Sequence, residues 1–432
     1  MKNSNIQWIG EIPDDWEVSK LKYIFDYIHR GQTPNYVEKS NCKVVNQSTF
    51  SKFFFDRDNQ KFTTDCRYND NFIRKKDVLM ASTGGGVLGK VFYYDLDYND
   101  SIADSHVTIL RATNKIESKF YYYTLSILFD WINNNLAEGS TNQTELQRDL
   151  LGNSFFPLPP LATQTLIATY LDAKCSEIDG LIADINKQIE TLNELKKSTI
   201  TEAVTKGLNK NAKLKDSGIQ WIGMIPEGWK ESRVKYVSSL FGRIGFRGYT
   251  QQDLVDEDNG AITLSPSNMK NMKMNYEKCS YISWFKYNES PEIKVENGDI
   301  LFVKTGSTYG KSAYVSELPK EATINPQLIV FKQSIMDKKM LAYILQTSLI
   351  SYQTELAVVG GTIPTMSQEK IKNFVLPLPP LTEQHAIATY LDSKCSEFDS
   401  IISDKQKQIS TLEAYKKSLI YEYVTGKKEV EL

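Results

Sequence analysis

The chain has 432 residues, which at about 150 residues per domain corresponds to two or three domains. Lysine and arginine number 51 and aspartate and glutamate 53, so the net charge of −2 excludes a uniformly basic DNA-coating protein. The charged fraction of 24% and the aromatic fraction of 11% exclude a wholly disordered chain.

Apolar runs and cysteine usage point to a cytoplasmic protein. No run of about 18 apolar residues is present, and the first residues lack the apolar segment of a secretory signal. The five cysteines have no C-x-x-C spacing, and the chain holds only three histidines. We therefore expect no zinc site, no disulfide framework and no membrane partner. The cysteines are Cys42, Cys66, Cys175, Cys279 and Cys395.

Residues 1–156 are predicted to form a first α+β domain. Short runs rich in β-branched and aromatic residues predict strands at 77–82, 90–94 and 107–110. The apolar spacing over 120–134 predicts a helix that packs on these strands.

Residues 157–207 are predicted to form one long helix after a proline-rich entry. Pro159 and Pro160 suit the first turn of a helix, and no proline follows between 165 and 205. Apolar residues then recur at alternating steps of four and three, which is heptad spacing. At about 1.5 Å per residue, roughly 40 residues make a rod of about 60 Å. The heptad positions are Ile178, Ile182, Ile185, Ile189 and Leu192.

A polar, basic linker is predicted at 208–216, and the plan of the chain then repeats. The sequence IQWIG at 6–10 returns at 219–223. Residues 157–207 match 377–427 at 31 of 51 positions, which composition alone does not produce. The duplication therefore sets two near-identical helical blocks after two blocks that have diverged.

The second copy consists of a domain at 217–376 and a helical block at 377–432. Strands are predicted at 300–303 and 328–331, and a helix at 340–355. This domain shares only a skeleton with the first, so the two copies should present two different surfaces on one scaffold. The second heptad stripe consists of Phe398, Ile402, Lys405, Ile409 and Leu412.

The two heptad stripes are expected to pair as an antiparallel coiled coil with pseudo-two-fold symmetry. A long amphipathic helix needs a partner for its apolar stripe, and the other copy offers a matching one. Lys405 interrupts its stripe, where it would either extend its ammonium group into water or face a gap. The alternative is that each helix packs only on its own domain.

A glycine-rich segment at 84–90 matches the G-x-x-x-x-G-K pattern of phosphate-binding loops. Val91 replaces the hydroxyl residue that would bind magnesium, and 91–94 has the pattern of a strand rather than a helix. The equivalent segment at 306–312 is one residue too short. We therefore expect a glycine turn between strands, with Lys90 free to touch a DNA phosphate, and no ATP site.

No catalytic constellation emerges from the sequence. Neither a methyl-donor loop in front of a helix nor an N-P-P or D-P-P tetrad is present. Glu292 and Lys294 resemble a fragment of a nuclease site, but an isolated E-x-K is common by chance. His29, His106 and His385 are scattered and lack triad partners, so they are interpreted as polar contacts.

Loops rich in hydrogen-bonding side chains are the candidate DNA-reading surface. Asparagine, glutamine, serine and arginine read base edges, and arginine suits the two acceptors of guanine. Each loop taken alone could equally be an ordinary polar turn. The candidate DNA contacts are Gln32, Thr33, Gln47, Ser48, Thr83, Lys90, His106, Thr141 and Gln143 in the first copy. In the second copy they are Arg243, Arg247, Tyr249, Thr250, Ser267, Asn268, Lys304, Thr305, Lys311, Gln327 and Thr362.

The order of these motifs closely resembles the specificity subunit of type I restriction–modification systems. The resemblance rests on W-I-G-x-I-P-x-x-W, a variable domain, P-L-P-P-L-x-x-Q-x-x-I-A-x-Y-L-D and a long helix, all repeated once. The turn at 31–34 and the run at 243–248 are similar to loops of that family. One departure is Thr163, which stands where the second copy has Glu383.

This resemblance implies a non-catalytic DNA reader and scaffold. Two target-recognition domains would each read half of a bipartite, asymmetric site in double-stranded DNA. Two modification subunits would dock on the conserved helices, and two motor–nuclease subunits would complete the complex. S-adenosylmethionine, ATP and magnesium would then bind the partner subunits, with no cofactor in this chain. Candidate partner contacts are Gln164, Tyr170, Glu383, Gln384 and Tyr390.

Two other functions remain open on sequence grounds. The chain could be a stand-alone DNA-binding regulator, which would bind a specific duplex tightly without partners. It could also be a nuclease or methyltransferase with an unfamiliar site, in which case the purified chain would bind a methyl donor.

Overall fold

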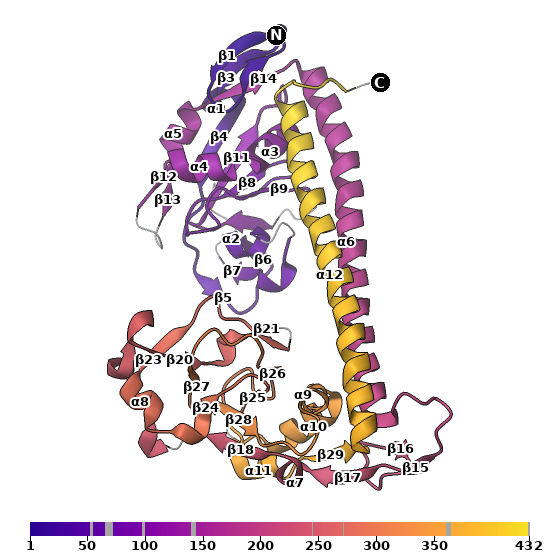
Figure 1. The fold of residues 1–432 in the computed structure, drawn as a ribbon. Coiled ribbons are helices and arrows are strands. Elements are labelled where there is room, and N and C mark those ends of the chain that lie inside the picture. Colours follow the sequence, from indigo (N-terminus) through magenta and orange to yellow (C-terminus); the bar gives the residue numbers. More distant parts are fainter. Residues whose placement is uncertain are drawn as a thin grey trace. The chain divides into compact units, whose positions relative to one another are not determined.

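The computed structural model describes residues 1–51, 55–64, 72–96, 100–139, 144–243, 245–270, 272–359 and 364–430. The chain divides into two compact units, and Figure 1 shows it coloured along the sequence. Unit 1 contains Met1–Asn186 and Gln406–Leu432, and unit 2 contains Lys187–Lys405. Each unit thus combines one mixed α+β domain with part of each long helix. The predicted α+β class and the two domains on paired helices are confirmed.

Unit 1 is built on two four-stranded sheets. One has the order β4-β11-β8-β9 and is antiparallel, and the other has the order β10-β6-β7-β5, with β10 parallel to β6. The predicted strands near 78, 91 and 107 are β8, β9 and β11, in which aliphatic and aromatic residues pack on both faces. The sheets consist of β4 (Phe25–Arg30), β5 (Tyr36–Val37), β6 (Cys42–Val45), β7 (Lys61–Thr63), β8 (Val78–Ala81), β9 (Val91–Tyr93), β10 (Ser101–Ala103) and β11 (Val107–Ala112).

Short hairpins and helices complete unit 1. The pair of β3 and β14 joins the start of the domain to the segment that leads into the long helix. The paired strands are β1 (Lys2–Ile6) with β2 (Gly10–Ile12), β3 (Glu17–Lys20) with β14 (Phe155–Leu158), and β12 (Ala137–Glu138) with β13 (Glu145–Leu146). The helices are α1 (Leu21–Ile24), α2 (Gln47–Phe50), α3 (Ser118–Ser126), α4 (Phe129–Asn135), α5 (Arg148–Asn153) and the first part of α6 (Leu161–Lys206), with a 3-10 turn at Arg57–Asn59.

Unit 2 repeats this plan with longer sheets. The six-stranded sheet has the order β18-β28-β25-β26-β22-β21, and the five-stranded sheet has the order β19-β23-β20-β27-β24. The predicted strands at 300 and 328 are β25 and β28. The strands are β18 (Ser239–Gly242), β19 (Leu254–Val255), β20 (Gly260–Leu264), β21 (Met269–Lys270), β22 (Lys273–Met274), β23 (Ser280–Ser283), β24 (Lys294–Val295), β25 (Ile300–Val303), β26 (Ser312–Tyr314), β27 (Ala322–Ile324) and β28 (Leu328–Lys332).

The remaining elements of unit 2 again include a strand pair at the root of a long helix. Strand β17 (Lys230–Arg233) pairs with β29 (Val375–Leu378), and β15 (Leu214–Asp216) pairs with β16 (Met224–Pro226). The predicted linker at 208–216 therefore contributes a short strand. The helices are α7 (Val234–Val237), α8 (Trp284–Asn288), α9 (Lys338–Ile344), α10 (Ser348–Ala357), α11 (Gln368–Lys372) and the first part of α12 (Leu381–Val424). The 3-10 turns lie at Gly245–Arg247, Gln251–Asp253, Glu257–Asn259, Pro266–Asn268 and Pro291–Ile293.

Each helix predicted inside a domain is in fact two shorter helices. The segment 120–134 is divided into α3 and α4, and 340–355 into α9 and α10. At the breaks, the Ser126 hydroxyl donates to the Tyr123 carbonyl and the Thr347 hydroxyl to the Ile344 carbonyl, each at 2.7 Å. A hydroxyl that bonds to its own helix backbone competes with the helical ladder and favours a boundary there.

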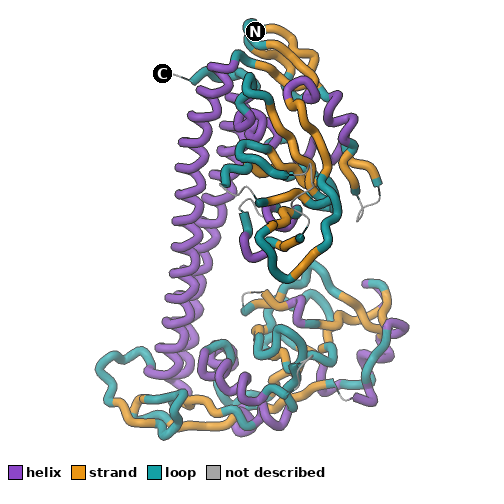
Figure 2. Tube along the Cα trace, turned by 180° about the vertical axis from the view of Figure 1, so that it is seen from behind, coloured by secondary structure: helices purple, strands orange, loops and turns teal. Residues whose placement is uncertain are grey.

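The predicted antiparallel pairing of the long helices is confirmed within each unit. In unit 1, Asp179 of α6 bonds to Lys416 of α12 at 2.6 Å, and Tyr170 meets Tyr423 nearer the start of α6. In unit 2, Lys196 bonds to Asp399 at 2.6 Å. Residues of α6 thus meet α12 in reverse order, and the helices run side by side in Figures 1 and 2.

The heptad stripes are buried where a domain covers them and half-buried elsewhere. Ile178 is 5% exposed and belongs to the core of unit 1, whereas Ile182 and Ile185 are half-buried. Lys405 is half-exposed and its ammonium donates to Gln188, so the side chain reaches out of the stripe rather than facing a gap. Both domains contribute apolar residues to the helix faces, so the stripes serve domain packing as well as helix pairing.

Candidate nucleic-acid interface

Both units position their candidate loops with the same backbone hydrogen bonds. The Ser82 N–H donates to the His106 carbonyl in unit 1, and the Lys304 N–H donates to the Gln327 carbonyl in unit 2, each at 2.8 Å. The carbonyls of Ser82 and Lys304 in turn accept from Leu146 and Met366 at 2.8 and 2.9 Å. One frame therefore holds the loop after β8 and the loop after β25.

Different side chains occupy equivalent places in this frame. Ser82 of unit 1 corresponds to Lys304 of unit 2, and His106 corresponds to Gln327. The loop before His106 is closed by its N–H on Asp104, and the loop before Gln327 by its N–H on Asn325, at 2.8 and 3.0 Å. The backbone is thus shared by the copies, while the side chains differ: Ser82 is 1% exposed and bonds to the Thr108 hydroxyl, whereas Lys304 is only half-buried.

In unit 1, five predicted or neighbouring side chains form one polar chain. Thr83 Oγ1 lies 2.6 Å from His106 Nδ1 and donates to Gln47 Oε1 at 3.3 Å. Asp104 accepts from the His106 N–H and, at 3.2 Å, from the Tyr36 hydroxyl. The sheets therefore bring together side chains that lie up to 68 residues apart in the chain, as Tyr36 and Asp104 do. His106 is exposed and Gln47 half-exposed, and both can donate or accept hydrogen bonds.

Burial raises the pKa values of Asp104 and Tyr36, which lie at one end of this series of polar contacts. Desolvation raises the pKa of the Asp104 carboxyl, and the hydrogen bonds from His106 and Tyr36 oppose that rise. Burial and the nearby Asp104 together raise the pKa of Tyr36 to about 12, so its hydroxyl stays a donor at neutral pH. Asp104 bonds to the backbone of His106, so the arrangement orders a loop rather than orienting the imidazole for catalysis.

The turn at 31–34 lies beside the same loop. The Thr33 hydroxyl donates to Ser105 Oγ at 3.0 Å, and Gln32 and Thr33 are exposed. A Cβ at Gly31 would lie 2.2 Å from the carbonyl oxygens of Ala103 and Asp104, so only glycine allows this close approach.

Arg30 and Glu145 of unit 1 also lie at this site, although the sequence did not indicate them. Arg30 donates to the Ser105 carbonyl and pairs with Glu145, and both side chains are partly exposed. The available signal was position: Arg30 directly precedes the predicted turn, and Glu145 follows the predicted polar loop. Ser48 is exposed, and its hydroxyl donates to the side-chain oxygen of Asn46, which caps α2.

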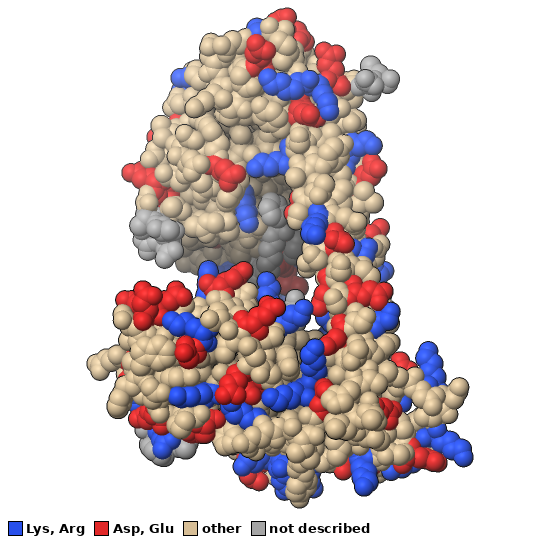
Figure 3. Space-filling model, viewed as in Figure 1, with Lys and Arg blue, Asp and Glu red and all other residues tan. Residues whose placement is uncertain are grey.

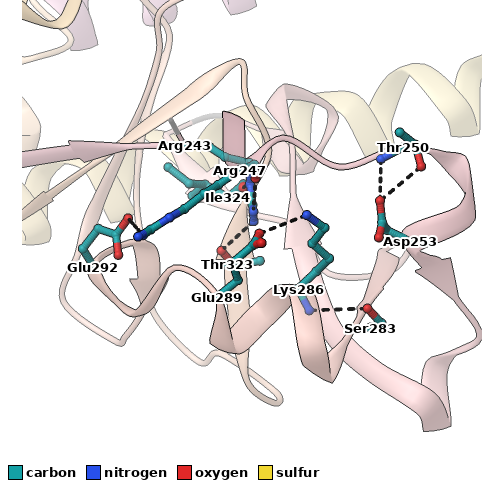
Figure 4. A network of polar contacts seen from close by, with 10 residues as sticks. All are labelled: Arg243, Arg247, Thr250, Asp253, Ser283, Lys286, Glu289, Glu292, Thr323 and Ile324. Carbon is teal, nitrogen blue, oxygen red and sulfur yellow. Dashed lines mark hydrogen bonds and ion pairs between the residues drawn. The ribbon is translucent and has the colours of Figure 1, made fainter. Parts of the chain in front are cut away.

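Arg243 is buried inside unit 2 and bonds to its backbone, contrary to the expectation that it reads guanine. It is 5% exposed, and its guanidinium donates at 3.2 Å to the carbonyls of Ile324 and Arg247 and to the Thr323 hydroxyl (Figure 4). Burial lowers its pKa, and its guanidinium carbon lies 5.3 Å from the Tyr249 ring. The arginine takes the place that Gly31 occupies in unit 1, where the chain packs on the equivalent carbonyl.

The Arg247 side chain remains partly exposed to solvent. Its side chain is 35% exposed and lies 3.4 Å from Glu292 (Figure 4). Lys294 bonds instead to Asn288 at 2.7 Å, so the E-x-K fragment is divided between two separate contacts. Tyr249 is half-buried, and exposed Thr250 forms a capping box with Asp253.

Ser267 and Asn268 belong to a capped 3-10 turn. Asn268 is 3% exposed, and its amide bonds to the backbone of Ser265, Asn275 and Lys278 at 3.0 to 3.3 Å. Its polar atoms are therefore used inside the fold, whereas Ser267 is exposed beside it. Sequence spacing could not separate these two roles.

Lys90 and Lys311 each bind a backbone carbonyl. Lys90 is therefore not free to touch a DNA phosphate, contrary to the expectation from the sequence. The Lys90 ammonium donates to the Ser51 carbonyl at 2.9 Å, and the Lys311 ammonium donates to the Met269 carbonyl. In each unit, the lysine thus links the strand that follows the glycine turn to the C-terminal end of a short capped helix. Residues 91–93 form β9, a strand, as predicted, so the segment at 84–90 lacks the helix that a nucleotide loop requires.

Lys304 differs from both of these lysines. It is half-buried, and burial lowers its pKa. Within the described part of the chain, its ammonium has no acidic partner and no hydrogen bond. Thr305 and Gln327 lie beside it in the loop frame, and Gln327 accepts from Asn325 at 3.0 Å. A desolvated cation without a countercharge is a favourable contact for a phosphate.

Gln164 and Gln384, which are equivalent in the two copies, are buried and present no free surface to a partner. Gln384 is 4% exposed, and its amide accepts from the Asp337 N–H and donates to the Pro379 carbonyl, both at 2.8 Å. Gln164 makes the same two contacts with Glu117 and Pro159. Each glutamine joins the proline turn, a domain helix and the long helix, because one amide carries both a donor and an acceptor.

Of the other predicted partner contacts, Glu383 and Tyr170 already contact residues of this chain, and Tyr390 is exposed. Glu383 accepts from the Trp229 indole at 2.8 Å and is half-buried, so the Glu-to-Thr163 difference changes an internal contact. The Tyr170 ring lies 4.6 Å from that of Tyr423, whereas Tyr390 is 37% exposed. Thr141, Gln143 and Thr362 lie outside the described residues.

The described residues were also compared with the requirements of metal sites, membrane spans and disulfides. Among them no group of three or more histidine, cysteine or acidic residues is placed to hold a metal ion, and no helix is long and apolar enough to cross a bilayer. Cys42 is disulfide-bonded, a departure from the expected reduced cysteines, and its bonding partner lies outside the described residues. Acidic and basic side chains are interspersed over unit 2 in the view of Figure 3.

The comparisons with known proteins agree with this geometry. A family model described as "Type I restriction modification DNA specificity domain" matches residues 13–191 and 226–411. The chain is 26% identical to the type I restriction enzyme MjaVIII specificity subunit of Methanocaldococcus jannaschii, over 97% of this chain and 94% of that protein. It is 29% identical to the putative MjaX specificity subunit of the same organism, over 98% and 96%. Relatives named as specificity subunits agree with the expectation of a non-catalytic subunit.

Solved structures share the fold. The HsdS subunit from Thermoanaerobacter tengcongensis aligns over 99% of this chain and 100% of its own, with a TM-score of 0.50 and 17% identity. A chain described under "complex assembly" and "conformational transition of the type I R-M system" aligns over 96% and 98%, with a TM-score of 0.70 and 16% identity. Because the family model covers most of both copies, this chain belongs to the type I restriction–modification DNA specificity family.

Proposed function

We propose that the chain reads a bipartite, asymmetric sequence in double-stranded DNA, one half-site for each domain. The observation that carries this proposal is the shared backbone frame with different side chains at one equivalent place, exposed His106 in one copy and half-buried Gln327 in the other. Two identical readers on a duplicated scaffold would favour a mirrored site. Unlike donors and acceptors at equivalent places favour two unrelated half-sites.

The experiment is methylome sequencing of a host that carries this chain with its cognate partner subunits. We expect a methylated motif of two unlike parts separated by unspecified bases. His106→Ala should relax base preference in one part, and Gln327→Ala should relax it in the other. A continuous or palindromic motif, or two variants that alter the same half, would contradict the proposal.

We also infer that the chain is the scaffold on which two methyltransferase and two motor–nuclease subunits assemble. A relative of known structure is described under complex assembly of the type I system, and exposed Tyr390 on α12 offers a contact for such a partner. S-adenosylmethionine, ATP and magnesium would bind those partners. Light scattering of the co-purified complex tests the stoichiometry, and loss of assembly in Tyr390→Ala, with the Thr389→Ala complex unaffected, tests the contact.

A further inference from the structure

Unit 2 contains a cavity that unit 1 fills with a side chain. The cavity measures about 230 Å³ and lies against α9, α12 and β26. Its lining includes Tyr314, Ala342, Tyr343, Gln346, Asp392 and Cys395. All of these residues belong to unit 2, so the cavity belongs to one compact body.

The polar walls of this cavity recur in unit 1. The Tyr343 hydroxyl donates to Asp392 at 2.8 Å, and the Tyr123 hydroxyl donates to Asp172 at 2.6 Å. The ion pair of Lys196 with Asp399, both lining residues, recurs as that of Lys416 with Asp179. The two units therefore build the same surroundings from equivalent elements.

The centre of these surroundings differs between the copies. The residue before Tyr343 is Ala342, and the residue before Tyr123 is Tyr122. The Tyr122 ring lies 5.1 Å from that of Tyr123 and 6.0 Å from that of Tyr93, and Cys175, Asp172 and Asp179 are its electrostatic neighbours. Burial raises its pKa to about 12. Tyr122 thus occupies in unit 1 the space that Ala342 leaves open in unit 2.

The size of the open space suits one aromatic ring. An engineered cavity of about 150 Å³ accepts benzene, and this one is larger. Unlike that apolar case, its lining carries polar groups. Gln346 lines the cavity, and its side-chain oxygen is buried without a hydrogen-bond partner among the described residues. A buried acceptor without a donor favours a ligand that brings a hydroxyl group.

The charge of the lining favours an anionic ligand. Lys196 and Lys339 are paired with Asp399 and Asp392, but Lys273 also lines the cavity and pairs with no acidic residue in the described part of the chain. In unit 1 the position of Ser316, another lining residue, is held by Asp95. The lining of the unit 2 cavity therefore holds the lysines Lys196, Lys273 and Lys339 against the acids Asp392 and Asp399, which leaves an excess positive charge.

We propose that this cavity is a binding site for a small phenolic acid, a single aromatic ring that carries a hydroxyl group and a carboxylate. The ring takes the space that Tyr122 fills in unit 1, the hydroxyl group supplies a donor for Gln346, and the carboxylate pairs with Lys273. The proposal concerns unit 2 alone and is independent of DNA reading.

The test is calorimetric titration of the full chain with 4-hydroxyphenylacetate and, as the uncharged probe, p-cresol. We expect saturable binding of one molecule of either probe, with the acid bound at least about tenfold more tightly. Lys273→Gln should remove that preference and leave p-cresol binding unchanged. Ala342→Tyr should abolish binding of both probes and raise the unfolding temperature, whereas Ala342→Ser should retain binding.

Tyr122→Ala gives an independent gain-of-function test that does not depend on the folding of Ala342→Tyr. It should open the equivalent cavity in unit 1 and add a second p-cresol site. Failure of both probes to saturate the unmodified chain, or equal binding to folded Ala342→Tyr, would overturn the proposal. An unchanged p-cresol stoichiometry in Tyr122→Ala would also overturn it.

Discussion

Replacing Lys304 by glutamine should weaken DNA binding and reduce its dependence on salt. The ammonium is half-buried and has no countercharge within the described part of unit 2, and burial lowers its pKa. A DNA phosphate at the loop would supply the missing charge and release a condensed cation. Each such contact contributes about −0.9 to the slope of log K against log salt.

The size of the effect follows from that slope. Over a fourfold rise in salt, for example from about 50 to about 200 mM, one contact changes affinity by about 3.5-fold. The unmodified chain, assembled with its partners, should therefore lose about 3.5-fold more affinity than Lys304→Gln over this range. As the pH rises towards the lowered pKa of Lys304, the ammonium loses its proton, so the unmodified complex should also lose affinity while the variant does not.

Fluorescence anisotropy with a duplex that contains the recognised site measures both dependences. Lys311→Gln is the matched control, because its ammonium is already bound to the Met269 carbonyl in the same unit. That variant should lose about 1–2 kcal/mol of unfolding free energy and keep the salt slope. Equal salt slopes for the unmodified chain and Lys304→Gln would refute the assignment of Lys304 to a phosphate.

Three further predictions concern stability and reactivity. Gln384→Ala should lower the unfolding free energy measured in urea by about 2–4 kcal/mol, because it leaves two buried backbone groups unpaired. An unchanged urea midpoint would contradict the proposal that Gln384 links the proline turn to the domain helix. In a thermal unfolding assay, Gly31→Ala should destabilise the protein by about 1–3 kcal/mol because its Cβ would clash with two carbonyl oxygens. Gly180→Ala, whose Cβ would lie in open space on α6, should instead stabilise the protein by about 0.5–1 kcal/mol. Burial raises the pKa of both thiols, that of Cys175 to about 11, but Cys279 is only half-buried. Iodoacetamide should therefore label Cys279 before Cys175 at pH 8. Labelling of Cys175, followed by peptide mass spectrometry, should accelerate as the pH rises towards 11.

The sequence by itself determined the duplication, the long helices and their pairing. These features depend on local periodicity and on identity between copies, and 31 shared positions make the second copy unmistakable. Heptad steps place Ile178 and its neighbours on one stripe whatever the rest of the chain does. The predicted strands near 78, 107, 300 and 328 are found for the same reason, since an apolar run of that length needs burial on both faces.

The tertiary structure alone decided which polar residues are available. Arg243 bonds to Ile324, 81 residues away, and Gln384 to Asp337, 47 residues away, so no local pattern shows that these side chains are already used. Lys304 and Lys311 look alike in sequence, yet only Lys311 meets a backbone carbonyl. Likewise, Ala342 became informative only when its surroundings were seen to match those of Tyr122. A side chain's type is fixed by the sequence, but its burial and its hydrogen-bond partners depend on strands and loops that are distant in the chain.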